Sequence, residues 1–156
     1  LALSEKNQTG HSGLDNVELI HEALPELNFS EVTLEHRTLG QTLPTPFLIS
    51  SMTAGHAGSG KLNQLLAEAA ESHGWMMGVG SQRRELNDPK ASAEWREIRK
   101  HAPNVRLLGN LGLSQLIRTE LKDIEALVDA LEAFAMIIHL NPLQECLQPE
   151  GTPEFR

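Results

Sequence analysis

Four short polar runs carry the side chains that could do chemistry in this sequence. The runs are SSMTAG at 50–55, GVGSQR at 78–83, GNLG at 109–112 and HLNPLQE at 139–145. Small residues in such runs let a flat ligand lie against the backbone, and the amides and hydroxyls supply directed hydrogen bonds. A glycine after a strand often serves only the turn. Four such runs in succession, each rich in polar side chains, instead predict a shared ligand site.

The segments between these runs predict how they are brought together. The runs recur about every thirty residues, the length of one strand–helix unit. Short apolar segments before the runs are expected to be strands, at 47–49, 75–79, 105–108 and 136–140. Apolar residues at helical spacing predict helices from 62 to Gly74, from Pro89 to before Pro103, and over 121–131. This alternation is typical of an α/β protein whose parallel sheet binds ligands at its carboxyl edge.

Residues 1–43 are expected to form an amino-terminal extension ahead of the repeating part, which spans 44–156. Residues 1–16 are polar and punctuated by glycine, as in an extended lead-in. Asp15 then precedes apolar residues at 17, 20 and 24, which predict a short helix stopped by Pro25. Weak alternation over 29–39 predicts a small hairpin or an edge strand.

Length and charge limit the possible classes of protein. With 156 residues, 40% of them hydrophobic, the chain has the size and composition of one globular domain. A formal net charge of −8 disfavours nucleic acid and anionic membranes as partners. A single cysteine, Cys146, and the lack of a long apolar segment predict a cytoplasmic protein with no membrane span. Because the chain opens with Leu1 rather than Met, we expect it to be a piece of a longer protein.

A possible nucleotide-binding pattern lies at 55–61, where GHAGSGK matches GxxxxGK between an expected strand and an expected helix. That pattern requires Ser or Thr as the next residue to hold Mg²⁺, and position 62 is Leu. No apolar strand ending in Asp follows to supply the second magnesium ligand. Nucleotide hydrolysis is therefore not expected.

Taken in order, the runs closely resemble the motifs of type 2 isopentenyl-diphosphate delta-isomerases. The resembling segments are 9–15, 49–55, 78–83, 110–112, 138–145 and 148–151, which together extend over almost the whole chain. The resemblance implies an FMN-dependent (β/α)₈ TIM barrel that interconverts isopentenyl and dimethylallyl diphosphate by a 1,3 proton shift in isoprenoid biosynthesis. Because a full barrel takes about 250 residues, the chain is expected to supply the amino-terminal half, with the first four strand–helix units.

The resemblance also implies cofactors and site residues. The cofactors are reduced FMN, Mg²⁺ and NADPH as reductant. The implied FMN contacts are Ser51, Met52, Thr53, Ser81 and Asn110. The implied substrate contacts are Ser81, Gln82, Arg83, His139, Asn141 and Gln144. Arg83 suits a diphosphate because its guanidinium is a planar fork of donors. Gln144 is the implied catalytic residue beside the allylic carbons, where it would relay or position, because an amide donates no strong acid proton. Glu145 is the implied ligand of Mg²⁺, which prefers hard oxygen atoms.

Considered one at a time, some of these residues have simpler explanations, and the motifs depart from the family in places. Glu145 follows Pro142 in an expected loop, where a solvated carboxylate is common. His139 ends a buried strand, where histidine is often structural. Ala54 stands where the family has Gly. The family's Arg-Lys-x-x-His segment would precede Leu1, and its later lysine and glycine-rich phosphate loops would follow the fourth strand.

Two other functions stay open at this point. The chain could be a non-catalytic half-barrel, whose open sheet edges and exposed apolar faces should make it associate. It could also belong to another FMN-dependent barrel, a hydroxyacid oxidase or dehydrogenase, although those enzymes use a histidine base from later strands and the 139–145 run speaks against them. For the isomerase, the resemblance implies a homo-oligomer, a tetramer or an octamer, that acts on a small isoprenyl diphosphate.

Overall fold

The chain divides into two units, Leu1–Thr33 and Leu34–Arg156. The structure, a computed structural model, describes residues 13–53, 58–149 and 151–154. Described residues of the first unit form two 3₁₀ turns, η1 (Leu14–Asn16) and η2 (Phe29–Glu31). The second unit holds the strands and the α-helices of the described residues, and it includes a hairpin that the sequence analysis places in the extension.

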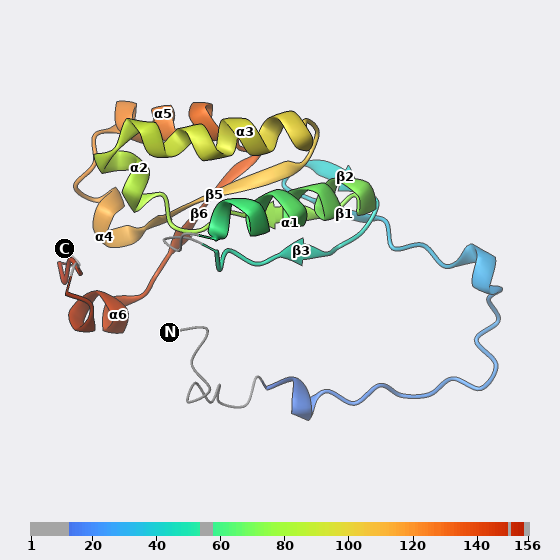
Figure 1. Ribbon diagram of the computed structural model, residues 1–156. Coiled ribbons are helices and arrows are strands. Elements are labelled where there is room, and N and C mark those ends of the chain that lie inside the picture. Colours follow the sequence, from blue (N-terminus) through green and yellow to red (C-terminus); the bar gives the residue numbers. More distant parts are fainter. Residues whose placement is uncertain (1–12, 54–57, 150, 155–156) are drawn as a thin grey trace. The chain divides into compact units, whose positions relative to one another are not determined.

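A four-stranded parallel sheet forms the centre of the second unit (Figure 1). Its strands, in spatial order, are β3 (Leu48–Ile49), β4 (Met76–Gly78), β5 (Arg106–Gly112) and β6 (Ala135–His139). Each neighbouring pair is parallel, with Met77 opposite Leu107 and Gly112 opposite His139. The predicted α/β class with a parallel sheet is confirmed, and the sheet is compatible with part of a barrel.

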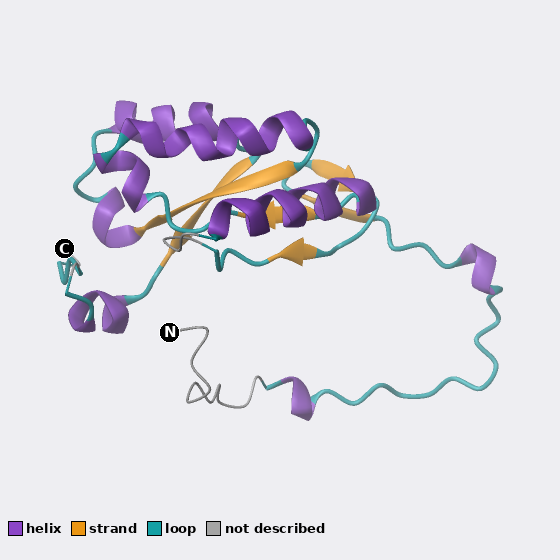
Figure 2. Ribbon diagram, viewed as in Figure 1, coloured by secondary structure: helices purple, strands orange, loops and turns teal. Residues whose placement is uncertain are grey.

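Three longer helices pack on one face of this sheet (Figure 2). They are α1 (Ser59–His73), α3 (Ala93–His101) and α5 (Leu121–Leu131). Because successive strand residues point to opposite faces, Met77 and Leu107 pack against these helices. Their neighbours Met76 and Leu108 form a separate cluster with Leu43. Across the described ranges, none of the helices combines the length and apolar character that a membrane span needs.

Leu43 belongs to a small antiparallel hairpin of β1 (His36–Thr38) and β2 (Gln41–Leu43). Leu39 and Gly40 join the strands with positive φ angles of 47° and 76°. Two positive φ angles in a two-residue loop are the requirement of a type I′ turn, and glycine meets it without steric cost. A hairpin is therefore present as predicted, over 36–43 rather than within 29–39.

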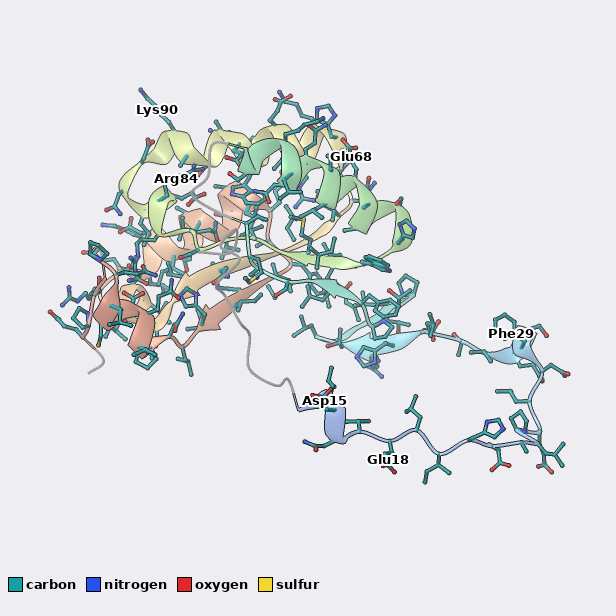
Figure 3. All side chains as sticks on the ribbon, turned by 60° about the horizontal axis from the view of Figure 1, so that its bottom comes forward. Asp15, Glu18, Phe29, Glu68, Arg84 and Lys90 are labelled. Carbon is teal, nitrogen blue, oxygen red and sulfur yellow. The ribbon has the colours of Figure 1, made fainter. Side chains whose placement is uncertain are left out.

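The short helix predicted over residues 17–24 is wrong. Only η1 forms in this part of the chain, and the side chain of Ile20 is 96% exposed. The side chains of Glu18 and Phe29 are also exposed (Figure 3). A helix this short is stable in water only when its apolar face is buried against other residues. The spacing of apolar residues here is thus not accompanied by the burial that would make a helix stable.

Three unpredicted short helices follow strand ends. They are α2 (Arg83–Asn87), α4 (Leu113–Leu116) and α6 (Pro142–Leu147). The expected loop around Glu145 is therefore wrong, because α6 begins at Pro142, whose fixed φ suits the first helical position. The GNLG run lies inside β5 and not after it. The helix predicted from Pro89 is a 3₁₀ turn, η3 (Pro89–Ser92), that leads into α3.

The apolar spacing that predicts a helix from residue 62 also predicts that Leu62 faces the sheet, but α1 buries a different side. Leu62 and Leu65 are 46% and 51% exposed, whereas Asn63 is buried. Asn63 Nδ2 donates to Glu94 Oε1 on α3 at 3.2 Å and to the Thr53 carbonyl at 3.5 Å. Since a buried amide has to be hydrogen-bonded, these contacts satisfy Asn63 on the side of α1 that also buries Ala67 and Ala70 in the core.

Candidate functional site

Most side chains predicted for the site gather at the carboxyl edge of the parallel sheet. Six of them line one cavity of about 380 Å³: Thr53, Ser81, Arg83, His139, Gln144 and Glu145. Asn141 lines a smaller cavity of about 160 Å³ together with His139 and Glu145. The other four do not line these two cavities: Ser51, Met52, Gln82 and Asn110.

Arg83 and Glu145 form an ion pair in the larger cavity. Arg83 begins α2 after β4, and Glu145 lies in α6 after β6. Arg83 Nη2 donates to Glu145 Oε1 at 2.6 Å and to Oε2 at 2.7 Å. The Glu145 side chain is 7% exposed and that of Arg83 is 24% exposed, so the pair is screened less by salt than a surface pair. The fold thus brings together two predicted site residues from distant parts of the sequence.

Two further groups lie against the Glu145 carboxylate, and one of them donates a short hydrogen bond. The backbone N–H of Thr152 donates to Oε2 at 2.7 Å, and the Gln115 amide nitrogen lies 3.4 Å from the same oxygen. Burial raises the pKa of Glu145, but the Thr152 N–H and the charge and hydrogen bonds of Arg83 outweigh burial and bring the pKa below its ordinary value. The carboxylate is therefore ionised at neutral pH. We call Arg83, Gln115, Glu145 and Thr152 the ion-pair cluster.

A second cluster, built around amides, connects β4, β5 and β6. Gln82 Oε1 accepts from the Asn110 backbone N–H at 3.1 Å, and Gln82 Nε2 donates to the Leu127 carbonyl at 3.4 Å. Asn110 Nδ2 donates to the Val79 carbonyl at 3.1 Å, and its Oδ1 lies 2.7 Å from His139 Nδ1. We call Gln82, Asn110 and His139 the amide cluster. Its two amide side chains are buried and bonded within the protein, so they hold the strand ends in register.

The contact with Asn110 assigns the tautomer of His139. Because Asn110 Nδ2 donates to a carbonyl, Oδ1 acts as the acceptor and His139 Nδ1 carries the proton. Burial lowers the pKa of His139, the charge of Glu145 opposes that effect, and the charge of Arg83 adds to it, so the pKa lies below its ordinary value. The ring is neutral near pH 7 and offers Nε2 as an acceptor. A Cβ on Gly112 would lie 3.0 Å from Nε2, so glycine leaves room for the ring.

The loop after β3 presents the first three predicted FMN contacts in different settings. Ser51 Oγ is buried and has no hydrogen-bond partner among the described residues. Met52 is exposed, and Thr53 Oγ1 donates to Asn63 Oδ1 of α1. A buried hydroxyl without an internal partner fits a ligand contact. Parts of the predicted motifs lie outside the described residues, at 9–12, 54–57 and 150.

Gln144, the predicted catalytic residue, lies in the first turn of α6. Asn141 precedes that helix, and its Nδ2 donates to Gln144 Oε1. Both side chains are exposed, and Gln144 lines the larger cavity. With its oxygen bonded to Asn141, the Gln144 amide presents Nε2 as a donor.

A magnesium ion at Glu145 would have one protein carboxylate. In the parts of the chain that the structure describes, no group of three or more His, Cys, Asp or Glu side chains could hold a metal. Mg²⁺ commonly binds one or two carboxylates together with substrate phosphates and water. A single buried, ionised glutamate beside an arginine fits that coordination.

Gln115 and Thr152 are functional candidates that the sequence analysis missed. Gln115 lies three residues after the GNLG run, and its only signal is a polar residue inside the mainly apolar stretch LGLSQL. Thr152 acts through its backbone N–H, which no pattern of side chains reveals.

Comparisons with known proteins identify relatives with one shared name. The isopentenyl-diphosphate delta-isomerase of Bdellovibrio bacteriovorus is 50% identical over 161 residues, which cover 100% of this chain and 46% of the relative. The protein of that name from Legionella pneumophila (strain Corby) is 48% identical over 157 residues, with the same coverage. The one from Archaeoglobus fulgidus is 40% identical over 151 residues, which cover 97% of this chain and 44% of the relative. No protein-family model matches the chain.

These relatives confirm the resemblance that the motifs indicate. The similarity extends over nearly the whole chain, through all four polar runs. The chain spans a little less than half the length of the curated relatives it matches.

Proposed function

We propose that this chain forms part of the active site of an enzyme that interconverts isopentenyl diphosphate and dimethylallyl diphosphate in isoprenoid biosynthesis. Relatives named for this isomerase, 40–50% identical over at least 97% of the chain, support the proposal. The observation that carries it is the larger cavity, where motif residues scattered from Thr53 to Glu145 come together. That cavity lies at the carboxyl edge of the sheet, where α/β enzymes bind their ligands.

We further propose that the sheet is one half of a (β/α)₈ barrel. The support is that its four strands are all parallel, that its helices pack on one face, and that the chain covers about half of each relative. Four more strand–helix units would then pair with the outer edges of β3 and β6 and close the barrel. From the resemblance we also propose a cytoplasmic homo-oligomer for the full-length protein.

Arg83 and Glu145 are the proposed binding residues for the charged end of the substrate. The guanidinium offers parallel N–H donors that match phosphate oxygens. Glu145 is ionised and largely buried, and it offers hard oxygens to a Mg²⁺ ion that also binds the diphosphate. His139 and Asn141 line the smaller cavity beside Glu145, which supports positions near the same diphosphate.

Reduced FMN, with NADPH as reductant, would supply the acid–base or electron-donating group next to the alkene. Its proposed contacts in this chain are Ser51, Met52, Thr53, Ser81 and Asn110. Ser51 supports this proposal with its buried hydroxyl, and Asn110 would contribute by holding the end of β5 and the ring of His139. Gln144 is proposed to lie beside the allylic carbons, where its Nε2 donor would position or relay a proton.

The test is turnover of isopentenyl diphosphate by the full-length protein with FMN, NADPH and Mg²⁺. We expect dimethylallyl diphosphate, with deuterium taken up from D₂O because the reaction exchanges a proton with solvent. Lys90→Gln, which changes an exposed side chain on η3, is the matched control and should keep the rate (Figure 3). Net oxidation of a hydroxyacid, or flavin binding without any turnover, would contradict the proposal.

A further inference from the structure

The side chain of Gln115 lies beside both members of the Arg83–Glu145 pair, and the orientation of its amide decides which of them it bonds. No motif assigns it a role. It lies in α4 and is 8% exposed. In one orientation its Nε2 lies 3.4 Å from Glu145 Oε2. Turned by half a rotation, the same amide places its oxygen 2.7 Å from Arg83 Nη2 and 3.3 Å from Arg83 Nε. The second orientation sets one acceptor against two donors, so the guanidinium is held between a carboxylate and an amide oxygen.

The pairing with Arg83 competes with any cation for Glu145. Both carboxylate oxygens accept hydrogen bonds from Arg83 Nη2, and Oε2 also accepts from the Thr152 N–H. A divalent cation needs the same lone pairs, so it has to displace the guanidinium. Displacement leaves the arginine charge without its partner in a largely buried place, which is unfavourable until an anion takes over the guanidinium.

We propose that Gln115 is a positioning residue that holds Arg83 against Glu145 and thereby lowers the affinity of this carboxylate for a divalent cation. The inference rests on the proposed function for the identity of the ligands, a divalent cation and a diphosphate. Gln115 touches neither ligand and acts through Arg83. When the diphosphate draws Arg83 away, Glu145 becomes available to the cation, so the two ligands favour each other's binding.

The test is the affinity of the full-length protein for Mn²⁺ without any phosphate, measured from the electron paramagnetic resonance signal of unbound Mn²⁺. Arg83→Met should raise the affinity by about tenfold, because the competing cation is gone. Gln115→Met, which keeps the length of the side chain but loses the acceptor, should raise it by about threefold. Arg84→Met is the matched control, because it removes a neighbouring charge that pairs with Glu94 at 3.4 Å, and among the described residues this arginine makes no hydrogen bond or ion pair with Glu145. It should change the affinity by less than about twofold.

A second variant at Gln115 distinguishes the positioning role from a general loss of folding. Gln115→Asn retracts the amide from Arg83 and should also raise the Mn²⁺ affinity, with thermal unfolding as the check on folding. The positioning role would be overturned if Mn²⁺ binding is unchanged or weaker in Arg83→Met and in both Gln115 variants while Glu145→Gln abolishes it. That result would leave Glu145 as the ligand. Undiminished Mn²⁺ binding in Glu145→Gln would overturn the metal assignment in the proposed function, and the positioning role with it.

Discussion

The ion-pair cluster and the amide cluster lie at the same edge of the sheet, but different partners hold them. Gln82 and Asn110 bond to backbone groups of neighbouring elements, at Asn110, Leu127 and Val79. Arg83 and Glu145 bond to each other through side chains on two short helices. A ligand cannot take a backbone partner without disturbing strands and helices, whereas it can replace a side-chain partner. We therefore propose that Gln82 and Asn110 maintain the fold at this edge, whereas Arg83 and Glu145 exchange contacts with ligands.

The largest effect is expected from Glu145→Gln in the cluster that exchanges contacts. A neutral amide is a poor replacement for the proposed carboxylate ligand of Mg²⁺, so the apparent Mg²⁺ affinity should fall on the order of 100-fold. The measurement is the isomerisation rate of the full-length protein as a function of Mg²⁺ concentration. An unchanged rate at limiting Mg²⁺ would contradict the role of Glu145.

Arg83→Met should have the next largest effect, a loss in the free energy of unfolding, because it leaves the buried Glu145 carboxylate without its cationic partner. Breaking a buried pair costs about 3–5 kcal/mol, and partial exposure of Arg83 reduces the expected loss in the free energy of unfolding to about 2–3 kcal/mol. Urea denaturation measures it. Arg84→Met, in an exposed pair, should cost less than about 1 kcal/mol. Equal losses for the two arginine variants would remove the distinction between the pairs.

Gln82→Met should lower the stability of the fold and leave ligand binding unchanged. The change leaves the Asn110 N–H without its acceptor and the Leu127 carbonyl without its donor, which should cost about 1–3 kcal/mol of unfolding free energy. Mn²⁺ affinity should stay as in the parent protein. If instead the stability is kept and Mn²⁺ or substrate binding is lost, Gln82 belongs with the residues that contact ligands.

Lowering the pH should reduce the stability contributed by the two clusters in two different pH ranges. The folded-state pKa of His139 lies below its ordinary value of about 6.5, so its contribution to stability is complete above that pH and is lost as pH falls through the lower folded value. The contribution of Glu145 to stability is likewise complete above its ordinary pKa of about 4.3, and it is lost as pH falls through the folded pKa, which is also lowered. Unfolding free energies across pH should therefore lose the first dependence in His139→Gln and the second in Glu145→Gln. The opposite assignment of the two pH ranges would contradict these environments.

Outside both clusters the expected effects are smallest. Ile20 is 96% exposed in a segment without a helix, so Ile20→Ser should change the unfolding free energy by no more than about 0.5 kcal/mol. A loss of several kcal/mol in the full-length protein would show that the rest of that protein buries this side chain.

The sequence predicts the strands, the long helices and the gathering of polar side chains at one edge of the sheet, because the polar runs recur with the strand–helix repeat. Because the strands are parallel, the runs that hold Arg83, Asn110 and Glu145 are expected at one edge of the sheet even when the contacts between these residues are unknown. The role of Gln115 could not be predicted, because it depends on the distance between α4 and α2 and not on spacing in the chain. The inward face of α1 was mispredicted for a similar reason, since it depends on contacts of Asn63 with the distant residues Thr53 and Glu94.

The most direct measurement is a crystal structure of the full-length protein with Mg²⁺ and isopentenyl diphosphate. Arg83 should then contact the diphosphate, Glu145 should bind Mg²⁺, and the contacts from Gln82 to Asn110 and from Asn110 to His139 should be unchanged. An intact Arg83–Glu145 pair in the occupied site, or a diphosphate bound to the amide cluster after its internal bonds have broken, would contradict the division into a cluster that exchanges contacts with ligands and one that maintains the fold.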